Sequence, residues 1–243
     1  MSSLLPSAVP MEELLQFLET YLTDERRQKL VEVARQRTRH LTVVVEDSFR
    51  EQNASAIVRT CDCCGIQDLH LVANSSDYQV AENIAMGARK WVDLHLYRDH
   101  PDNTVACLER LRAEGYQVVA TTPHQRAATP DTFDLKRPSA LFFGREKRGL
   151  SPVVFQEADA VLHIPMVGFT ESYNIAVSAA LVLYTLTQRL RQQEDTTWQL
   201  APDEALVLRL RWALRSLPRG RALVEHFYAQ RGQPFPAELD SWL

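Results

Sequence analysis

No segment of this 243-residue chain is apolar over the roughly twenty residues that a membrane-spanning helix requires, so we expect no transmembrane helix. Residues 1–10 lack the basic segment that opens a secretory signal, and we predict a disordered or expression-derived tail there. The sequence also lacks internal repeats and low-complexity stretches. With 45% hydrophobic and 24% charged residues, it predicts one globular domain with appendages, which we expect in the cytoplasm.

Cysteine is scarce, and its four positions do not suit a metal site. The cluster Cys61, Cys63 and Cys64 has no C-x-x-C partner elsewhere and no spaced histidines, so we expect no zinc and no other metal. Helical spacing places Cys61 and Cys64 on one side of a helix and Cys63 on another. We predict that these residues and Cys107 are small, buried side chains of a reduced cytoplasmic protein.

Glycine is also scarce, with eight residues in all, and two phosphate-binding signatures are missing. No G-x-G-x-x-G follows the first predicted strand, which argues against a dinucleotide-binding fold. The segment GREKRGLS at 144–151 has the spacing of a P-loop, but Leu150 stands where that loop requires lysine. The sequence therefore does not predict a nucleoside triphosphatase.

The net charge of −4 is mildly acidic, yet the basic residues gather toward the two ends of the chain. Residues 26–39 contain six lysines and arginines against Glu32 alone. Such a helix is more often a solvated face, but this excess raises the expectation of contacts to phosphate groups. A second arginine-rich region spans 189–231.

Strand-like and helix-like segments alternate through the middle of the chain. Apolar runs predict strands at 41–45, 68–72, 92–97, 117–121, 139–143 and 160–164. Between and after them, we predict helices from 53 to a stop at Gly65, at 81–89, 103–113 and 152–158, and from 175 onward. Further helices are predicted at 11–22, from 24 onward, at 203–215 and at 221–229, with a polar linker at 192–199 and a loose tail at 232–243. This alternation predicts an α/β fold with a largely parallel sheet.

Three polar clusters follow predicted strands, and open parallel sheets bind ligands at the carboxyl ends of their strands. They are Asn53 with Arg59, Arg145 with Glu146, and Glu171 with Ser172 and Asn174. Asn53 and either Ser172 or Asn174 can equally be helix N-caps. Arg59 stands among apolar neighbours, so we expect its side chain to be paired or to line a cavity.

Taken together, these clusters carry a family resemblance. The segments NASAIVRT (53–60), LFFGREKRGLS (141–151) and IPMVGFTESYNIAVSAA (164–180) resemble, in order, the three motifs of the SpoU class of SPOUT RNA methyltransferases. Within that class, the chain most resembles the TrmH-type tRNA guanosine-2′-O-methyltransferases over about residues 24–191. The resemblance implies methyl transfer from S-adenosylmethionine to the ribose 2′-hydroxyl of a D-loop guanosine, position 18, in tRNA.

The resemblance also implies an architecture that periodicity does not reveal. In it, residues 41–191 form a SPOUT methyltransferase domain, a mostly parallel sheet with flanking helices whose C-terminal part is threaded into a deep trefoil knot. Knots are otherwise nearly absent from proteins. Residues 1–40 form a helical RNA-contacting extension, and residues 192–243 form an arginine-rich helical one. A homodimer with the active site at the subunit interface is implied as well.

The resemblance assigns functional residues position by position. The implied catalytic residues are Asn53, Arg59, Glu146, Ser172 and Asn174. The implied cofactor-pocket residues, several acting through backbone groups, are Thr121, Gly144, Ile164, Met166 and Tyr173. The residues expected to contact RNA are Arg26, Arg27, Arg35, Arg189 and Arg191.

The residue types fit the chemistry of ribose methylation. A 2′-hydroxyl is a poor nucleophile and must lose its proton as it attacks the methyl group. The resemblance implies Arg59 as the base, but arginine is effectively always protonated in proteins. We therefore expect a substrate phosphate to relay the proton while Arg59 positions it and stabilises the developing oxyanion. Asn53 and Ser172 would orient the arginine and the ribose, Asn174 would hold Arg59 or the cofactor carboxylate, and Glu146 would anchor the assembly.

Two departures from the family pattern concern the substrate and the pocket. Residues 49–52 read Phe-Arg-Glu-Gln where a basic, His- and Pro-containing sequence is usual, and Tyr173 stands where leucine is usual. Two alternatives to the tRNA enzyme are an rRNA ribose methyltransferase and a non-catalytic RNA-binding SPOUT protein. The first often carries a separate N-terminal RNA-binding domain, for which residues 1–40 are too short. The second is disfavoured because all five implied catalytic residues are present.

Overall fold

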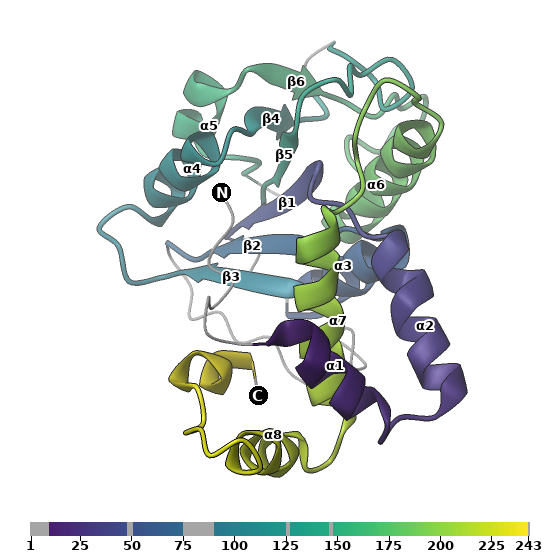
Figure 1. Ribbon diagram of the computed structural model, residues 1–243. Helices are drawn as coiled ribbons and strands as arrows, with labels where there is room; N and C mark the ends of the chain where they lie inside the picture. The colour runs from purple at the N-terminus through teal and green to yellow at the C-terminus, as the bar shows by residue number, and fades with distance from the viewer. Residues whose placement is uncertain (1–9, 48–50, 75–89, 125–126, 146–147, 243) are drawn as a thin grey trace. The chain divides into compact units, whose positions relative to one another are not determined.

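A computed structural model describes residues 10–47, 51–74, 90–124, 127–145 and 148–242 (Figure 1). The predicted helix at 81–89, the predicted tail up to residue 9, and Glu146 lie outside the described residues. The chain forms two compact units, one of residues 38–198 and one that combines residues up to 37 with residues from 199 onward. No helix within the described residues is long and apolar enough to cross a membrane.

The larger unit contains a six-stranded sheet in which every pairing is parallel. Its strands are β1 (Leu41–Glu46), β2 (Asp68–Val72), β3 (Asp93–Tyr97), β4 (Gln117–Thr121), β5 (Ser139–Phe143) and β6 (Ala160–Leu162). Their order across the sheet is β3-β2-β1-β5-β4-β6. The predicted α/β fold with a parallel sheet is confirmed. β6 ends two residues earlier than predicted, and the next backbone amide, that of His163, donates to the carbonyl of Ala128.

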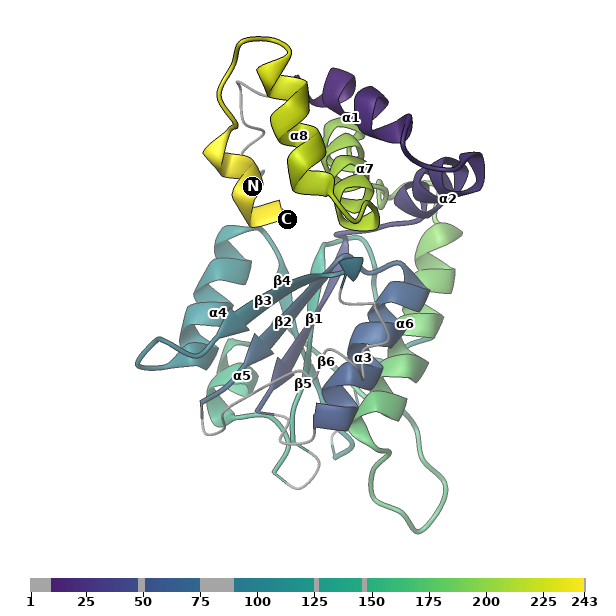
Figure 2. The same cartoon turned by 90° about the horizontal axis from the view of Figure 1, so that it is seen from below.

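Helices cover both faces of this sheet. α3 (Glu51–Cys64) and α6 (Ile175–Arg191) lie on one face, and α4 (Asn103–Ala113) and α5 (Pro152–Glu157) lie on the other (Figures 1 and 2). Alternate residues of β1 point to the two layers, so Val43 and Val45 join the core with α3 and α6 while Val44 joins the core with α4 and α5. Because both faces are covered, β1 is buried at every position, which is why it reads as a continuous apolar run.

The cysteines follow the helical geometry of α3. Cys61, Cys64 and Cys107 are buried free thiols, as predicted. Cys63 is exposed, so the expectation of burial is wrong for this residue, although its placement on another side of the helix is confirmed. A helix that packs on a sheet with one face leaves every third or fourth residue in solvent.

Helices from both ends of the chain build the smaller unit. They are α1 (Met11–Glu19), α2 (Asp24–Arg35), α7 (Pro202–Ser216), α8 (Gly220–Ala229) and a 3₁₀ helix (Ala237–Trp242). The Thr23 hydroxyl accepts from the amide of Arg26 at 3.2 Å and so caps the start of α2. The prediction of a loose tail at 232–243 is wrong in part, because the 3₁₀ helix buries Leu239 completely.

Several arginines of the smaller unit have protein partners. Arg37 is almost fully buried, with its guanidinium 5.2 Å from the ring centre of Trp212. Arg209 pairs with Glu19 at 2.7 Å and Arg231 pairs with Glu13 at 3.0 Å, so the C-terminal arginines join the two ends of the chain. Arginines of the smaller unit therefore stabilise the packing of its helices, and not all of them are available at the surface.

A buried polar cluster joins β2 and β3 in the larger unit. His95 Nε2 lies 2.8 Å from Asp68 Oδ1, and Arg39 pairs with the same carboxylate. Burial alone would raise the pKa of Asp68, but the hydrogen bond from His95 and the charge of Arg39 lower that pKa to about 2. His70 stacks on His95 with ring centroids 4.5 Å apart, and its Nδ1 lies 3.0 Å from the Tyr97 hydroxyl. Burial lowers the pKa of His70 to about 3.

His70 makes the stability of the fold depend on pH. Its pKa lies near 3 in the folded chain against an ordinary 6.5, so the unfolded chain binds more protons between these values. The free energy of unfolding therefore falls as the pH drops through this range. The slope of the free energy of unfolding against pH can be measured by urea denaturation between pH 6 and pH 4. We expect His70→Gln to reduce this slope by about 1.4 kcal/mol per pH unit. The exposed His124→Gln is the control and should keep the wild-type slope; a wild-type slope for His70→Gln as well would contradict the prediction.

Candidate active site

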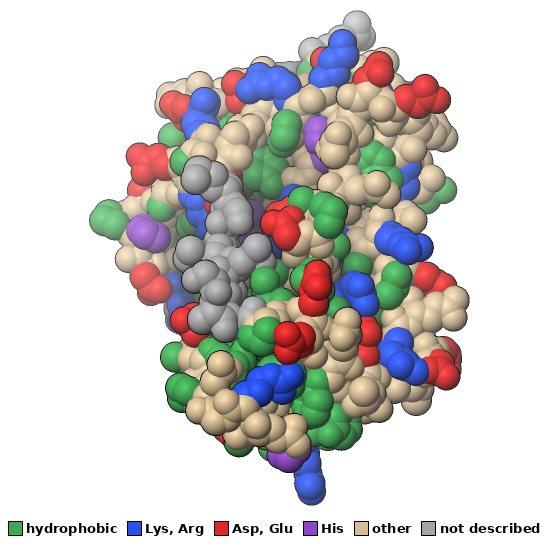
Figure 3. Space-filling view, in the orientation of Figure 1, with side chains coloured by type: hydrophobic (Ala, Val, Ile, Leu, Met, Phe, Trp, Pro, Cys, Tyr) green, Lys and Arg blue, Asp and Glu red, His purple; other side chains and the backbone are tan. Residues whose placement is uncertain are grey.

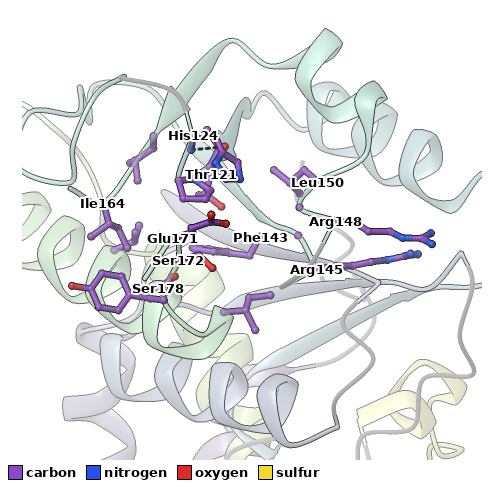
Figure 4. A pocket seen from close by; sticks show the side chains of 18 of the residues that line it. Thr121, His124, Phe143, Arg145, Arg148, Leu150, Ile164, Glu171, Ser172 and Ser178 are labelled. Carbon is purple, nitrogen blue, oxygen red and sulfur yellow. Dashed lines mark hydrogen bonds between the residues drawn. The ribbon is translucent and has the colours of Figure 1, made fainter. Parts of the chain in front are cut away.

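A cavity of about 500 Å³ opens at the carboxyl ends of β4, β5 and β6 (Figure 4). Three segments supply most of its wall: the end of β4 with residues 121–124, the loop after β5 with residues 143–145 and 148–150, and the segment from the end of β6 into α6. Ile164 and Arg148 lie on opposite sides of it in Figure 4. The second and third sequence motifs therefore meet at one cavity.

The loop after β5 is closed by its own backbone. The amide of Arg145 donates to the carbonyl of Gly149 at 3.1 Å, and the amide of Gly149 returns a bond of 2.9 Å to Arg145. A Cβ at Gly144 would lie 2.3 Å from the backbone carbonyl carbon of Gly149, so no other residue fits without moving the loop. Gly149 itself has a φ of +66°, which glycine adopts without strain. Glycine is therefore required at both ends of this turn.

The third motif begins α6 with the predicted cap. Asn174 Oδ1 accepts from the amides of Ala176 at 2.9 Å and Val177 at 3.4 Å, which confirms Asn174 as the N-cap. Its Nδ2 donates to Asn53 Oδ1 at 3.1 Å, so one side chain both caps α6 and joins the first motif to the third. The prediction of Asn53 as an N-cap is wrong, because α3 begins two residues earlier, at Glu51.

Arg59 occupies an exposed position on α3. Its neighbours Ile57, Val58 and Cys61 are buried, but Arg59 is exposed on another side of α3. The described residues that line the cavity do not include it. Arg59 is therefore not enclosed by its apolar neighbours, since adjacent helical positions point in different directions. The expectation that its side chain is paired or lines a cavity stays a prediction. Asn53, by contrast, is buried.

The residues predicted for the cofactor all line the cavity. They are Thr121, Gly144, Ile164, Met166 and Tyr173, and Ser172 lies with them. The hydroxyl of Thr121 donates to the carbonyl of Phe142 at 2.7 Å, so this side chain also ties β4 to β5. Glu146, predicted as catalytic, falls outside the described residues.

Two carboxylates that the sequence analysis did not single out stand behind this wall. Asp47 pairs with Arg145, and Glu46 accepts from the amide and the hydroxyl of Ser151 at 2.7 Å each. The signal available in the sequence was an acidic pair directly after an apolar strand. Among the described residues, no group of three or more His, Cys, Asp or Glu side chains is placed to hold a metal ion.

Comparison with known proteins identifies the family of this site. The model of the SpoU rRNA methylase family matches residues 40–184. The tRNA (guanosine(18)-2′-O)-methyltransferase of Borreliella burgdorferi is 35% identical over 195 residues, which cover 80% of this chain and 87% of that protein. The enzyme of the same name from Thermus thermophilus is 36% identical over 170 residues, 70% of this chain and 86% of that protein.

Solved structures agree with this assignment. The TrmH/SpoU tRNA modifying enzyme of A. aeolicus superposes with a TM-score of 0.69 at 29% identity, covering 81% of this chain and 98% of that one. The AdoMet-bound rRNA methyltransferase of Sinorhizobium meliloti superposes with a TM-score of 0.56 at 27% identity, covering 66% of this chain and 60% of that one. The residues that the family model matches include the parallel sheet and the three motifs. The chain belongs to the SpoU rRNA methylase family.

Proposed function

We propose that this protein transfers a methyl group from S-adenosylmethionine to the ribose 2′-hydroxyl of guanosine 18 in the D-loop of tRNA. The observation that carries the proposal is the meeting of the second and third motifs at one cavity, with Asn174 joined to Asn53 of the first. The relatives that are 35% and 36% identical are both named as tRNA guanosine-18 enzymes, and this favours tRNA over rRNA as the substrate.

The cavity suits S-adenosylmethionine in size and chemistry. About 500 Å³ lies within the usual range for small-molecule sites. Apolar side chains such as Ile164 and Met166 can cover an adenine ring, while Glu171 and Ser172 offer polar groups to the amino-acid portion. The cofactor supplies a methyl group on a sulfonium centre, which is already a good leaving group. In this proposal Thr121, Gly144, Ile164, Met166 and Tyr173 hold it, and no metal is required.

The protein's own residues have to activate the ribose. We assign Arg59 to a substrate phosphate and to the 2′-oxygen, where its fixed charge stabilises the oxyanion that develops as the proton leaves. Asn53 and Ser172 orient the reacting groups, Asn174 holds Arg59 or the cofactor carboxylate, and Glu146 anchors the assembly. The bond between Asn174 and Asn53 supports the shared placement of these two amides.

Arg59 can reach a cavity if a second copy of the chain supplies that cavity. Its exposure on α3, away from its own chain's cavity, supports a homodimer with the active site at the interface. An arginine from one protomer would then serve the cofactor bound by its partner. In this arrangement Arg59 can be catalytic although it is exposed on its own protomer, because it acts in the site of the partner.

A surface suited to such a dimer lies on α6 and the segment before it. Six of the eight large apolar side chains that are exposed among the described residues fall between 167 and 184: Val167, Phe169, Tyr173, Val177, Leu181 and Tyr184. Those on α6 recur at helical spacing, so they share one face. Apolar surface gathered in this way marks an interface, and we assign it to the second protomer.

The remaining assignments concern RNA and topology. Arg26 and Arg35 are exposed on α2 and Arg27 lies beside Asp24, so we propose α2 as a phosphate-contacting helix of the extension at 1–40. Figure 3 shows acidic and basic side chains interspersed on the face in view. Arg189 and Arg191 are half-buried and donate to the backbone carbonyls of Pro130 and Cys64, and we propose that the exposed part of each side chain contacts RNA. The deep trefoil knot within 41–191, the extension at 192–243 and a cytoplasmic location are proposed from family membership.

Methyl transfer from labelled S-adenosylmethionine to tRNA transcripts tests the function. We expect incorporation into a transcript with guanosine at position 18. A matched tRNA that carries 2′-deoxyguanosine at that position should gain no label, because the accepting hydroxyl is absent. Label in the deoxy substrate would contradict ribose methylation at this site. Label only in rRNA fragments would instead support the rRNA enzyme, and failure to label either RNA would favour a binding protein.

Two leucines of equal exposure provide a matched test of the dimer surface. Leu181 on α6 is 42% exposed and Leu96 on β3 is 43% exposed. We expect Leu181→Glu to convert the dimer to monomer in sedimentation equilibrium, weakening association by at least about tenfold, since it buries a charge in an apolar interface. Leu96→Glu should leave the dimer intact. A monomeric wild-type protein, or equal effects of the two substitutions, would contradict the assignment.

A further inference from the structure

Two consecutive acidic residues end β1 and enter the protein interior. Glu46 is 3% exposed and Asp47 is 5% exposed. Burying two adjacent carboxylates is costly unless each has hydrogen-bond donors or a cation, so their presence requires partners. The described residues that line the cavity include neither of them. Their partners, however, lie in the loop that forms its wall.

Asp47 holds the first half of that loop. One of its carboxylate oxygens pairs with the guanidinium of Arg145, and the other accepts from the backbone amide of Asn74 at 2.7 Å. Asp47 has a φ of +50°, a left-handed conformation that aspartate and asparagine adopt more often than most other non-glycine residues. The short carboxylate therefore suits both the backbone of this position and its two partners.

Glu46 holds the other end of the same loop. Its Oε2 accepts from the amide of Ser151 at 2.7 Å, and its Oε1 accepts from the Ser151 hydroxyl at 2.7 Å. The Thr104 hydroxyl donates to Oε1 as well, at 2.6 Å, from the first turn of α4. This carboxylate therefore fixes the start of α5 against the start of α4.

The two carboxylates belong to one closed network. Asn74 donates its backbone amide to Asp47 and its side-chain amide to the Thr104 hydroxyl at 2.7 Å, and Thr104 donates to Glu46. Every carboxylate oxygen of the pair accepts a hydrogen bond or an ion pair. A fully satisfied buried network is rigid, because displacing one member leaves the others unpaired.

We propose that Glu46 and Asp47 are positioning residues, which hold the two described ends of the loop after β5, residues 144–145 and 148–151, and so set the affinity of the cavity for the cofactor. The inference rests on the proposed function for the identity of that cofactor. Neither carboxylate lines the cavity; each acts through a residue of the wall or directly beside it, Arg145 or Ser151.

The need for a clamp follows from the loop's composition. Gly144 and Gly149 are required by the close approach and the left-handed turn, but glycine also lowers the cost of leaving that shape. A loop that is open part of the time binds more weakly in proportion to the fraction that is closed. External anchors at Arg145 and Ser151 keep the closed fraction high before the cofactor arrives.

Cofactor binding to purified, RNA-free protein tests the clamp by isothermal titration calorimetry. The variants are Asp47→Asn, Glu46→Gln and Arg145→Gln, with the exposed Asp99→Asn as the control. Asparagine tolerates the backbone of position 47, yet its single oxygen cannot serve both Asn74 and Arg145. We expect each clamp variant to weaken binding of S-adenosylmethionine and of S-adenosylhomocysteine by about tenfold or more, and the control to bind as the wild type does.

Two further measurements separate positioning from general stability. The double variant Asp47→Asn/Arg145→Gln should bind no more weakly than its weaker single variant, because both changes break one contact. In hydrogen exchange without cofactor, the amide of Gly149 should exchange at least about tenfold faster in the clamp variants, while strand amides of β1 and β5 keep their wild-type rates. Arg145→Gln is included because its partly exposed side chain can be replaced without opening the core.

Unchanged cofactor affinity in Arg145→Gln and Asp47→Asn, at a temperature where both are folded by circular dichroism, would overturn the inference. Faster exchange throughout the sheet with an unaltered dissociation constant would do the same, since it describes loss of stability alone. These results are distinct from failure of the proposed function, in which the wild-type protein itself would not bind S-adenosylmethionine.

Discussion

The parallel direction of all six strands is the constraint on which the site depends. Parallel pairing brings the carboxyl end of every strand to the same edge of the sheet, so residues 46–47, 121 and 143–145, far apart in sequence, meet in space. It also requires a crossover between successive strands, and three of these crossovers carry a helix that covers a face of the sheet: α3 after β1, α4 after β3 and α5 after β5. The cavity is therefore a consequence of the sheet, and the loops decide what chemistry it performs.

Helical geometry imposes the second constraint, on α3. The face of α3 that packs on the sheet carries Ile57, Val58 and Cys61, and Asn53 reaches Asn174 across to α6. Arg59 lies on another side of α3 and is exposed. The homodimer that we propose would account both for an exposed arginine on α3 and for the apolar face on α6. The exposed features are as informative as the cavity.

Local patterns predicted the strands and several helix bounds, because buried parallel strands are uninterrupted apolar runs. The strands at 68–72, 117–121 and 139–143 were placed without error, and so was the helix at 103–113. Predictions failed where the determining contact is remote or depends on helical phase. Asn53 follows Glu51 and Gln52 inside α3, and the polar character of these two residues gives no sign that the helix has already begun. Asp47 and Glu46 bond to residues about a hundred positions away, which no local pattern indicates. Packing of both chain ends into one unit has no local signal either.

The central claim is that Arg59 of one protomer completes the cavity of another, and mixed dimers test it most directly. Arg59→Ala lacks the arginine, whereas Gly144→Ala lacks an intact cavity because its Cβ would collide with Gly149. Each variant alone should be inactive, with cofactor binding retained by Arg59→Ala. An equal mixture, co-expressed so that protomers pair at random, should recover about a quarter of wild-type methyl transfer to tRNA, since half of the dimers hold one complete site each. An inactive mixture that contains mixed dimers would contradict the claim, because it would place Arg59 and the cavity in the same chain.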